Sequence, residues 1–345
     1  MRDRLTILSV AFPFAPVGPD AVGGAEQVLT AVEAAVVRAG HRSLVVACEG
    51  SVCRGTLIPT PRWERLDDSV REPAHDHHRR AIAAALERWP VDVIHLHGLD
   101  FAAYLPPPGP AVLATLHLSH RLYPHEAIFP SRPRTWLHAV SESQHRACPP
   151  GAPLLGPISN GVDLDVLRPG GRKRGFALAL GRICAEKGFH LALDAAAAAD
   201  VPLLLGGEVF TYPEHQRYFR EEIAPRLDRR RRFLGPVGLR RKRRLLAAAR
   251  CVLIPSQIAE ACPLVALEAL ACGTPVVASP LGALPEIVDS GRTGFLVETV
   301  EEMAEAIRRV GELDPADCRR EAERRFSNRA MVDRYLDLYR RLAEA

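Results

Sequence analysis

The chain is poor in aromatic residues, in lysine and in long apolar runs. Aromatic residues make up 6% of its 345 residues, which is too few for a surface that stacks nucleic-acid bases. The net charge of +4 is too small to indicate a nucleic-acid partner. No run reaches the roughly 18 apolar residues that a transmembrane helix needs. We therefore expect neither a nucleic-acid partner nor a transmembrane segment.

The sequence also lacks motifs for metal binding and for disulfides. Its eight cysteines are scattered and no C-x-x-C pair occurs, which argues against a zinc site and against a disulfide framework. Reduced thiols are typical of the cytoplasm, where we expect the protein to reside. The start, "MRDRLTILSVAFPFAP", has the basic and then apolar order of a signal peptide, but Pro13 and Pro16 interrupt the apolar run.

Short β-rich runs alternate with helical stretches along the chain, a pattern that predicts parallel sheets covered by helices on both faces. The first series of strands is "LTILSVAF", "SLVVAC", "VDVIHLH", "AVLATLH", "WLHAVS" and "LLGPIS", with helices near 25–39 and 77–89. The second is "FALAL", "VPLLLGG", "RRFLG", "CVLIP", "TPVVAS" and "TGFLV", with helices near 188–199, 214–225, 239–249 and 263–272. We predict an α/β protein of two Rossmann-like, doubly wound domains.

A linker is predicted at "RPGGRKRG", residues 168–175, where Pro, Gly and charge cluster without periodicity. It separates an N-terminal domain over 1–168 from a C-terminal domain over 169–326. We expect the two to face each other across a cleft, because sheets of this kind bind ligands at the carboxyl ends of their strands. Residues 327–345 predict a last helix that packs back toward the N-terminal domain.

Two glutamates stand in the largely apolar segment "SQIAEACPLVALEALACGTPVV", residues 256–277. Pro263 favours the first helical position, so Glu260 precedes a helix and Glu268 lies inside it. Neither glutamate has a Lys or Arg close by in sequence, and the amides of the helix start favour a phosphate. A nucleoside diphosphate fits this segment, with the ribose diol bound by Glu268. The alternative is two carboxylates on a solvated edge.

Two basic residues lie in "LALGRICAEKGFH", residues 178–190, where Arg182 and Lys187 fall on a predicted strand-to-helix loop. Only three of the 45 basic residues are lysines, so Lys187 departs from the composition of its own chain. Phosphate groups accept both a compact ammonium and a planar guanidinium. The alternative is a chance surface lysine.

The first half offers weaker signals. Gly24 opens a predicted helix after Gly23, so backbone amides can approach a ligand, although a Gly-Gly pair is also common in loops. His97 and His117 end two predicted strands, where a lone histidine is more often structural. The run "HDHH", 75–78, can bind metal, but we expect a solvent-exposed lead into a helix.

These segments together resemble the retaining, nucleotide-sugar-dependent glycosyltransferases of family four, which have the GT-B type of fold. "GRICAEKG", "EACPLVALEALACGTPVVAS" and "GALPEIV...GRTGFLV" resemble the C-terminal domain of that family. "VGGAEQVL", "VDVIHLHG", "LATLH", "VSESQ" and "PISNGVDLDVLRP" resemble its N-terminal half. The resemblance covers nearly the whole chain.

The resemblance implies a role for each matching residue. Arg182 and Lys187 would neutralise the donor diphosphate, Glu268 would hold the ribose, and Glu260 and His117 would contact the transferred sugar. Further contacts are implied for the donor phosphate or acceptor at one glycine and for the acceptor at two histidines: Gly24, His97 and His120.

The implied reaction moves a sugar from a nucleoside diphosphate, with UDP- or GDP-sugar expected, to a small-molecule, lipid-linked or glycan acceptor. No metal or other cofactor is implied, and the chain has no D-x-D motif. Relatives often carry an aromatic residue and glycine where this chain has Cys262 and Pro263. Proline has no N–H, so we expect the amides of Leu264 and Val265 to donate the hydrogen bonds to the phosphate.

Other interpretations stay open. The same fold serves a nucleotide-sugar epimerase, a phosphorylase that needs a pyridoxal-binding lysine, or a non-catalytic nucleotide-binding protein. Residues 226–250 carry eleven basic side chains and one acid. That region can contact anionic lipid or an acidic partner, and the alternative is a solvated face in an arginine-rich chain.

Overall fold

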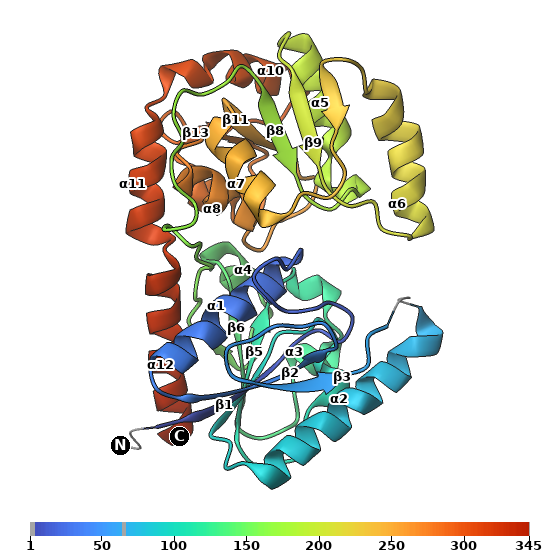
Figure 1. The fold of residues 1–345 in the computed structure, drawn as a ribbon, viewed down its shortest axis with the longest axis vertical. Coiled ribbons are helices and arrows are strands. Elements are labelled where there is room, and N and C mark those ends of the chain that lie inside the picture. The colour runs from blue at the N-terminus through green and yellow to red at the C-terminus, as the bar shows by residue number, and fades with distance from the viewer. Residues whose placement is uncertain (1–3, 64–66, 345) are drawn as a thin grey trace. The chain divides into compact units, whose positions relative to one another are not determined.

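The computed structural model describes residues 4–63 and 67–344, and they form two compact units (Figure 1). Unit 1 comprises Met1–Asn160 with Arg329–Ala345, and unit 2 comprises Gly161–Asn328. The linker expected at 168–175 lies within unit 2 and is bound to it. Lys173 Nζ donates to Ala247 O at 3.0 Å, and Arg174 N donates to Ala248 O at 2.7 Å.

Unit 1 is built on a seven-stranded sheet in the order β3-β2-β1-β4-β5-β6-β7, and all its neighbouring strands are parallel. The strands are β1 (Thr6–Val10), β2 (Arg42–Cys48), β3 (Thr56–Thr60), β4 (Val93–Leu96), β5 (Ala111–Leu116), β6 (Thr135–Ala139) and β7 (Leu154–Leu155). All six expected strands are present. β3 was not expected because Pro59 interrupts its apolar run, and an edge strand tolerates that proline.

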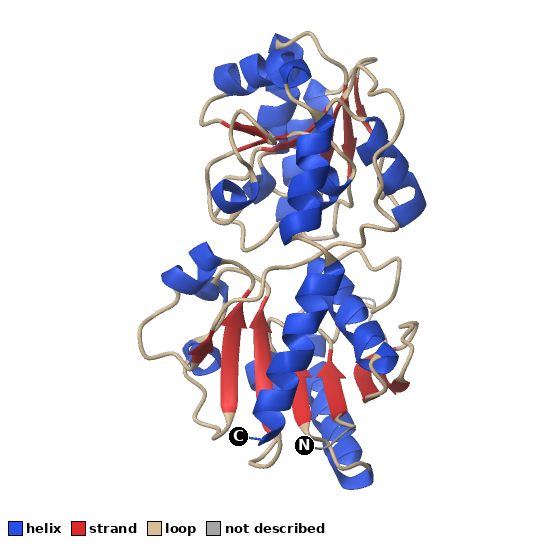
Figure 2. Cartoon of the chain, turned by 90° about the vertical axis from the view of Figure 1, so that its left-hand side faces the viewer, coloured by secondary structure: helices blue, strands red, loops and turns tan. Residues whose placement is uncertain are grey.

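Helices cover both faces of this sheet, as the two-residue period of its strands requires. Ile7 packs on the face of α1 (Gly24–Arg38) and α12 (Asn328–Glu344), while Leu8 points to the opposite face, which α2 (Asp68–Arg88) and α3 (His125–Ile128) cover. The remaining helix is α4 (Glu142–Ala147). Figure 2 shows a long helix lying along the strands of this unit.

The helix α2 begins earlier than expected, so the interpretation of "HDHH" as an exposed lead is wrong. The Asp67 carboxylate accepts a hydrogen bond from Ser69 N and caps the helix there, which places residues 75–78 inside it. His75 and His78 are buried. His75 Nε2 lies 2.7 Å from Asp100 Oδ2, so its polar atom is satisfied inside the fold.

Unit 2 repeats the plan with six parallel strands in the order β10-β9-β8-β11-β12-β13. They are β8 (Ala177–Leu180), β9 (Leu203–Gly206), β10 (Arg231–Phe233), β11 (Cys251–Ile254), β12 (Val276–Ala278) and β13 (Gly294–Leu296), all of them expected. The helices are α5 (Phe189–Ala198), α6 (Pro213–Tyr218), α7 (Leu239–Ala248), α8 (Leu264–Ala271), α9 (Leu284–Ile287), α10 (Val300–Arg309) and α11 (Pro315–Arg325). Because β8 and β11 are parallel neighbours, the loops that follow them lie at one edge of the sheet.

The helix α12 completes the core of unit 1. Its apolar side chains pack with β1, β4 and β5 and with α1; they are Met331, Val332, Leu338 and Leu342. Tyr339 Oη lies 2.6 Å from His95 Nδ1 on β4, deep in this core. The last helix of the chain therefore belongs to the first unit.

We expect Tyr339→Phe to destabilise unit 1 by about 1–3 kcal/mol, because the buried His95 Nδ1 loses its partner. All three tryptophans, Trp63, Trp89 and Trp136, lie in unit 1, so their fluorescence during urea unfolding reports on that unit. Tyr212→Phe in unit 2 is the matched control, since the Tyr212 hydroxyl has no hydrogen bond with a described residue. An unchanged tryptophan transition in Tyr339→Phe would contradict the role of this contact.

Candidate functional site

In unit 2, the loop after β8 is locked to the residues after β11. It ends at Gly188, whose φ of 63° is left-handed and where a Cβ would lie 2.1 Å from the carbonyl oxygen of Pro255. Gln257 N donates to Glu186 O at 2.8 Å. The position of Lys187 is therefore fixed relative to the segment that carries Glu260.

This arrangement joins Lys187 to Glu260. Lys187 Nζ lies 2.5 Å from Glu260 Oε1, and Ser256 Oγ donates to the same oxygen. The side chains are 24% and 10% exposed, so the pair is shielded but open to a ligand. The backbone of Glu260 is held as well, because Ala283 N donates to its oxygen at 2.8 Å.

Glu268 also has a cation, which comes from a part of the chain that is distant in sequence. Lys242 Nζ on α7 lies 2.5 Å from Glu268 Oε1 on α8, and Glu268 is 4% exposed. Lys242 was not predicted as a site residue, because it stands inside the arginine run of residues 240–244. Its signal was its type, since it is one of three lysines in the chain.

The start of α8 offers free amides beside these carboxylates. Pro263 precedes the helix as its N-cap and has no side-chain capping bond. Ala266 N donates to Pro263 O, whereas the amides of Leu264 and Val265 have no hydrogen-bond partner among the described residues. Arg182, after β8, is exposed and forms no ion pair with another described residue. These donors can meet an anion.

Unit 1 brings two of its three candidate histidines together. His97 Nδ1 lies 3.0 Å from His117 Nε2 and the rings are stacked, with His97 buried and His117 half-buried. The two residues follow the neighbouring strands β4 and β5. His120 sits on a short 3-10 turn, His120–Leu122, and its ring has no hydrogen bond with a described residue.

A buried polar chain lies beneath this pair, and the sequence analysis missed it. His138 Nδ1 must donate to Ala139 O at 3.0 Å, because a carbonyl oxygen only accepts. In the neutral ring its Nε2 then accepts from Thr115 Oγ1 at 2.7 Å. Thr115 Oγ1 in turn accepts from His95 Nε2 at 2.6 Å, which leaves His95 Nδ1 to accept from Tyr339. One carbonyl thus sets every proton position in the chain.

Burial keeps these histidines neutral. Desolvation, helped by neighbouring histidines, lowers the pKa of His117 to about 3 and holds the pKa of His95 and His97 well below the usual 6.5. Desolvation also lowers the pKa of His138 to about 4. His117 is therefore a neutral hydrogen-bonding group at physiological pH.

Gly24 is the exposed first residue of α1, and the glycine before it has a steric reason. A Cβ on Gly23 would lie 1.9 Å from Glu26 Oε2, so this carboxyl folds back under the glycine loop. Glu26 is 6% exposed, and burial raises its pKa. The sequence analysis missed Glu26, although an acid in the first turn after Gly-Gly was a usable signal.

The arginine-rich region 226–250 divides into paired and free side chains. Arg226, Arg230 and Arg231 form ion pairs with acids of unit 2. Four arginines of α7 are exposed and have no ion pair among the described residues: Arg240, Arg241, Arg243 and Arg244. A contact of this face with anionic lipid stays a prediction.

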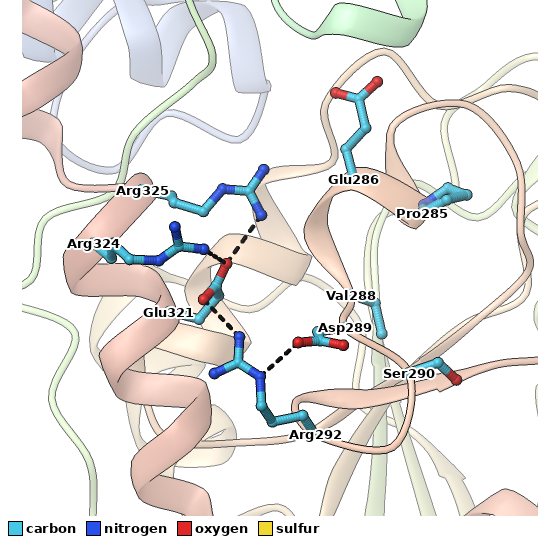
Figure 3. Close-up of a pocket in the computed structure, with 9 residues that line it drawn as sticks. All are labelled: Pro285, Glu286, Val288, Asp289, Ser290, Arg292, Glu321, Arg324 and Arg325. Atoms are coloured by element: carbon cyan, nitrogen blue, oxygen red, sulfur yellow. Dashed lines mark hydrogen bonds and ion pairs between the residues drawn. The ribbon is translucent and has the colours of Figure 1, made fainter.

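A charged pocket of about 300 Å³ lies elsewhere in unit 2 (Figure 3). Arg292, Arg324 and Arg325 converge on Glu321, at distances of 2.9, 2.7 and 3.0 Å. Burial alone would raise the pKa of Glu321, but these hydrogen bonds lower it to about 2. None of the expected site residues lines this pocket, and its three arginines are paired with acids of the pocket.

Comparisons with known proteins find similarity to glycosyltransferases in part of the chain. Residues 175–312 match the family model described as "Glycosyl transferases group 1", which includes the Arg182, Lys187, Glu260 and Glu268 segments. A D-inositol 3-phosphate glycosyltransferase of Saccharomonospora viridis is 37% identical over 212 residues, 53% of this chain and 49% of that protein. One of a Nocardioides species is 43% identical over 117 residues, 32% of this chain and 25% of that protein. The chain matches about half or less of the length of these curated relatives.

Solved structures match the whole chain. AviGT4, a glycosyltransferase involved in avilamycin A biosynthesis, has a TM-score of 0.73 at 24% identity, covering 99% of this chain and 98% of that one. Anabaena Alr3699/HepE, solved with UDP and glucose, has a TM-score of 0.75 at 19% identity, covering 97% and 99%. The fold is therefore the GT-B type, two Rossmann-like domains of parallel α/β structure. No helix in the described part of the chain is long and apolar enough to cross a membrane.

Unit 1 should lose stability in mild acid. A histidine whose pKa in the folded state lies below 6.5 contributes stability that is complete above pH 6.5 and is lost as the pH falls toward the folded value, about 4 for His138 and about 3 for His117. We therefore expect the urea midpoint of tryptophan fluorescence to fall steadily between pH 7 and pH 5. A midpoint that is constant over this range would contradict the neutral histidine chain.

Proposed function

We propose that the chain is a retaining glycosyltransferase that transfers a sugar from a nucleoside diphosphate sugar, with UDP- or GDP-sugar as the expected donor. The observation that carries the proposal is the Lys187–Glu260 pair beside the free amides of α8, within the segment that matches "Glycosyl transferases group 1". A fixed cation, a fixed carboxylate and unpaired amides are the groups that a diphosphate leaving group and its sugar require.

In this proposal each group acts where charge develops. Lys187 and Arg182 stabilise the departing diphosphate, and the amides of Leu264 and Val265 bind its oxygens. Glu260, oriented by Ser256 and Lys187, accepts hydrogen bonds from hydroxyls of the transferred sugar. The acceptor attacks from the face that the diphosphate leaves, and a diphosphate oxygen takes the acceptor proton, so that the anomeric configuration is kept.

The groups of unit 1 complete the proposal. Neutral His117, held by His97, donates or accepts a hydrogen bond at the transferred sugar, and Gly24 brings backbone amides to the donor phosphate or acceptor. His97 acts through His117, because it is buried. His120 contacts the acceptor substrate in this proposal. We propose that the reaction needs no metal.

Relatives and structural neighbours define the first substrates to test. The curated relatives are named for D-inositol 3-phosphate, and a structural neighbour was solved with UDP-glucose. We propose UDP-glucose as the first donor. D-inositol 3-phosphate is the first acceptor, tested beside lipid-linked and other small-molecule acceptors, and NMR of the product anomer tests retention. Isomerisation of the donor without any acceptor would instead favour a nucleotide-sugar epimerase.

Thermal unfolding with UDP, GDP, ADP and TDP, each with and without EDTA, tests whether the protein binds a nucleoside diphosphate. A ligand at one hundred times its Kd stabilises the folded state by about 2.7 kcal/mol. This corresponds to a rise of several degrees in Tm for a unit of this size. We expect at least one nucleotide to give this rise, unaffected by EDTA. If none of the four raises Tm, the protein does not bind a nucleoside diphosphate and the proposal fails.

Variants separate the diphosphate contacts from the sugar contact. Lys187→Ala should weaken binding of the stabilising nucleotide by tenfold or more, because it removes a charged hydrogen bond to phosphate. Glu260→Gln should leave nucleotide binding nearly unchanged but lower kcat for transfer by about 10²–10³-fold, since it acts at the sugar. Arg241→Ala, on the exposed face of α7, is the control for removal of a basic side chain. Full transfer activity in Glu260→Gln would show that this site assignment is wrong.

A further inference from the structure

One basic residue of the run "RRKRR", 240–244, points inward. Lys242 is half-buried, with its side chain 17% exposed, while the four arginines around it are exposed. The inward face of α7 also carries Leu246, which is fully buried four residues further along. The only lysine of the run therefore occupies the position that faces α8.

The pairing of α7 with α8 is fixed at both ends. Lys242 bonds Glu268 near the start of α7. At the other end Lys173 Nζ donates to Ala247 O at 3.0 Å, to Cys272 O at 3.2 Å and to Thr274 Oγ1 at 2.5 Å. A cation at these helix ends meets the negative ends of two helix dipoles. Because α7 cannot easily rotate, Lys242 stays over Glu268.

The contact with Lys242 involves only one of the two carboxylate oxygens of Glu268. Lys242 Nζ bonds Oε1, and Oε2 has no hydrogen-bond partner among the described residues. The Glu268 side chain is 6% exposed, so it is not completely enclosed within the unit. A carboxylate held at one oxygen and open at the other is prepared to accept hydrogen bonds from a diol.

We propose that Lys242 is a positioning residue of the donor site. Its ammonium lies against the buried Glu268 carboxylate and holds Oε1, so that Oε2 is directed at the vicinal hydroxyls of the ribose. A carboxylate this deeply buried would be costly without a cation, and the free arginines of α7 point away from it. This inference rests on the proposed function, since it assumes that a nucleoside diphosphate binds at α8.

The test compares ribonucleotides with their 2′-deoxy forms, because the loss of one ribose hydroxyl reads out the Glu268 contact directly. Calorimetric Kd values are measured for UDP, 2′-deoxy-UDP, GDP and 2′-deoxy-GDP with wild type, Glu268→Gln, Lys242→Met and Lys242→Gln. Lys242→Arg is the conservative rescue, and Arg241→Met is the matched control on the outer face of α7. Circular dichroism confirms the fold of each variant.

We expect wild type and Arg241→Met to bind the ribonucleotide about tenfold or more tightly than its 2′-deoxy form, as one hydrogen bond to a charged group provides. Glu268→Gln, Lys242→Met and Lys242→Gln should reduce this ratio to about twofold or less. Lys242→Arg should recover part of it. A merely structural Lys242 would lower Tm and leave the ratio as it is in wild type.

The outcomes separate the two proposals. If no nucleotide binds to the wild type, the proposed function fails. A second outcome is that the wild type binds the ribonucleotide more tightly than its 2′-deoxy form and Glu268→Gln does not, while Lys242→Met and Lys242→Gln keep the wild-type ratio of Kd values. In that case the proposed function stands and the role of Lys242 is wrong. Tighter ribonucleotide binding by both Lys242 variants would overturn the inference as well, because Lys242 would then compete with the ribose. The absence of discrimination in the wild type overturns the ribose contact and with it the role of Lys242.

Discussion

Pairs between shielded carboxylates and cations from distant parts of the chain organise unit 2. Glu260, Glu268 and Glu321 are largely buried, and each is bound by Lys or Arg from another part of the chain: Lys187, Lys242 and Arg292. Removing such a cation leaves an uncompensated charge, which costs several kcal/mol. The loops and helices that carry the cations are therefore tied to those that carry the acids.

The choice between lysine and arginine follows the space at each acid. Lys187 and Lys242 each reach a single carboxylate oxygen in a shielded place, and Lys173 spreads its three N–H bonds over three acceptors. A lysine ammonium is a compact point charge, whereas a guanidinium is a planar fork. Around Glu321 the surface is open, and there three arginines share one carboxylate (Figure 3). Each of the three lysines of the chain has identified partners within unit 2.

Sequence reasoning predicted the parts of the fold that depend on local pattern. Buried parallel strands are apolar runs, so every expected strand exists, while β3 was hidden by Pro59. The helices α10 and α11 were missed because their charged residues mask the apolar stripe, although Thr299 and Glu302 form a capping box that marks one start. Partners far apart in sequence were beyond reach: Lys187 and Glu260 are 73 positions apart, and His95 and Tyr339 are 244 apart. Lys187 and Glu260 were both singled out from the sequence, but their pairing was not, and their roles at a donor site stay predictions.

The order of elements along the chain has a consequence for folding. The core of unit 1 is completed by α12, which follows all of unit 2 in the sequence. Until α12 docks, His95 Nδ1 lacks its donor and the apolar faces of α1 and β1 stay uncovered. Contacts of such long sequence separation form late, because the chain loses the entropy of loop closure before these contacts stabilise it. Unit 2 contains all its own strands in one continuous segment, so it can fold first and bring the ends of unit 1 together.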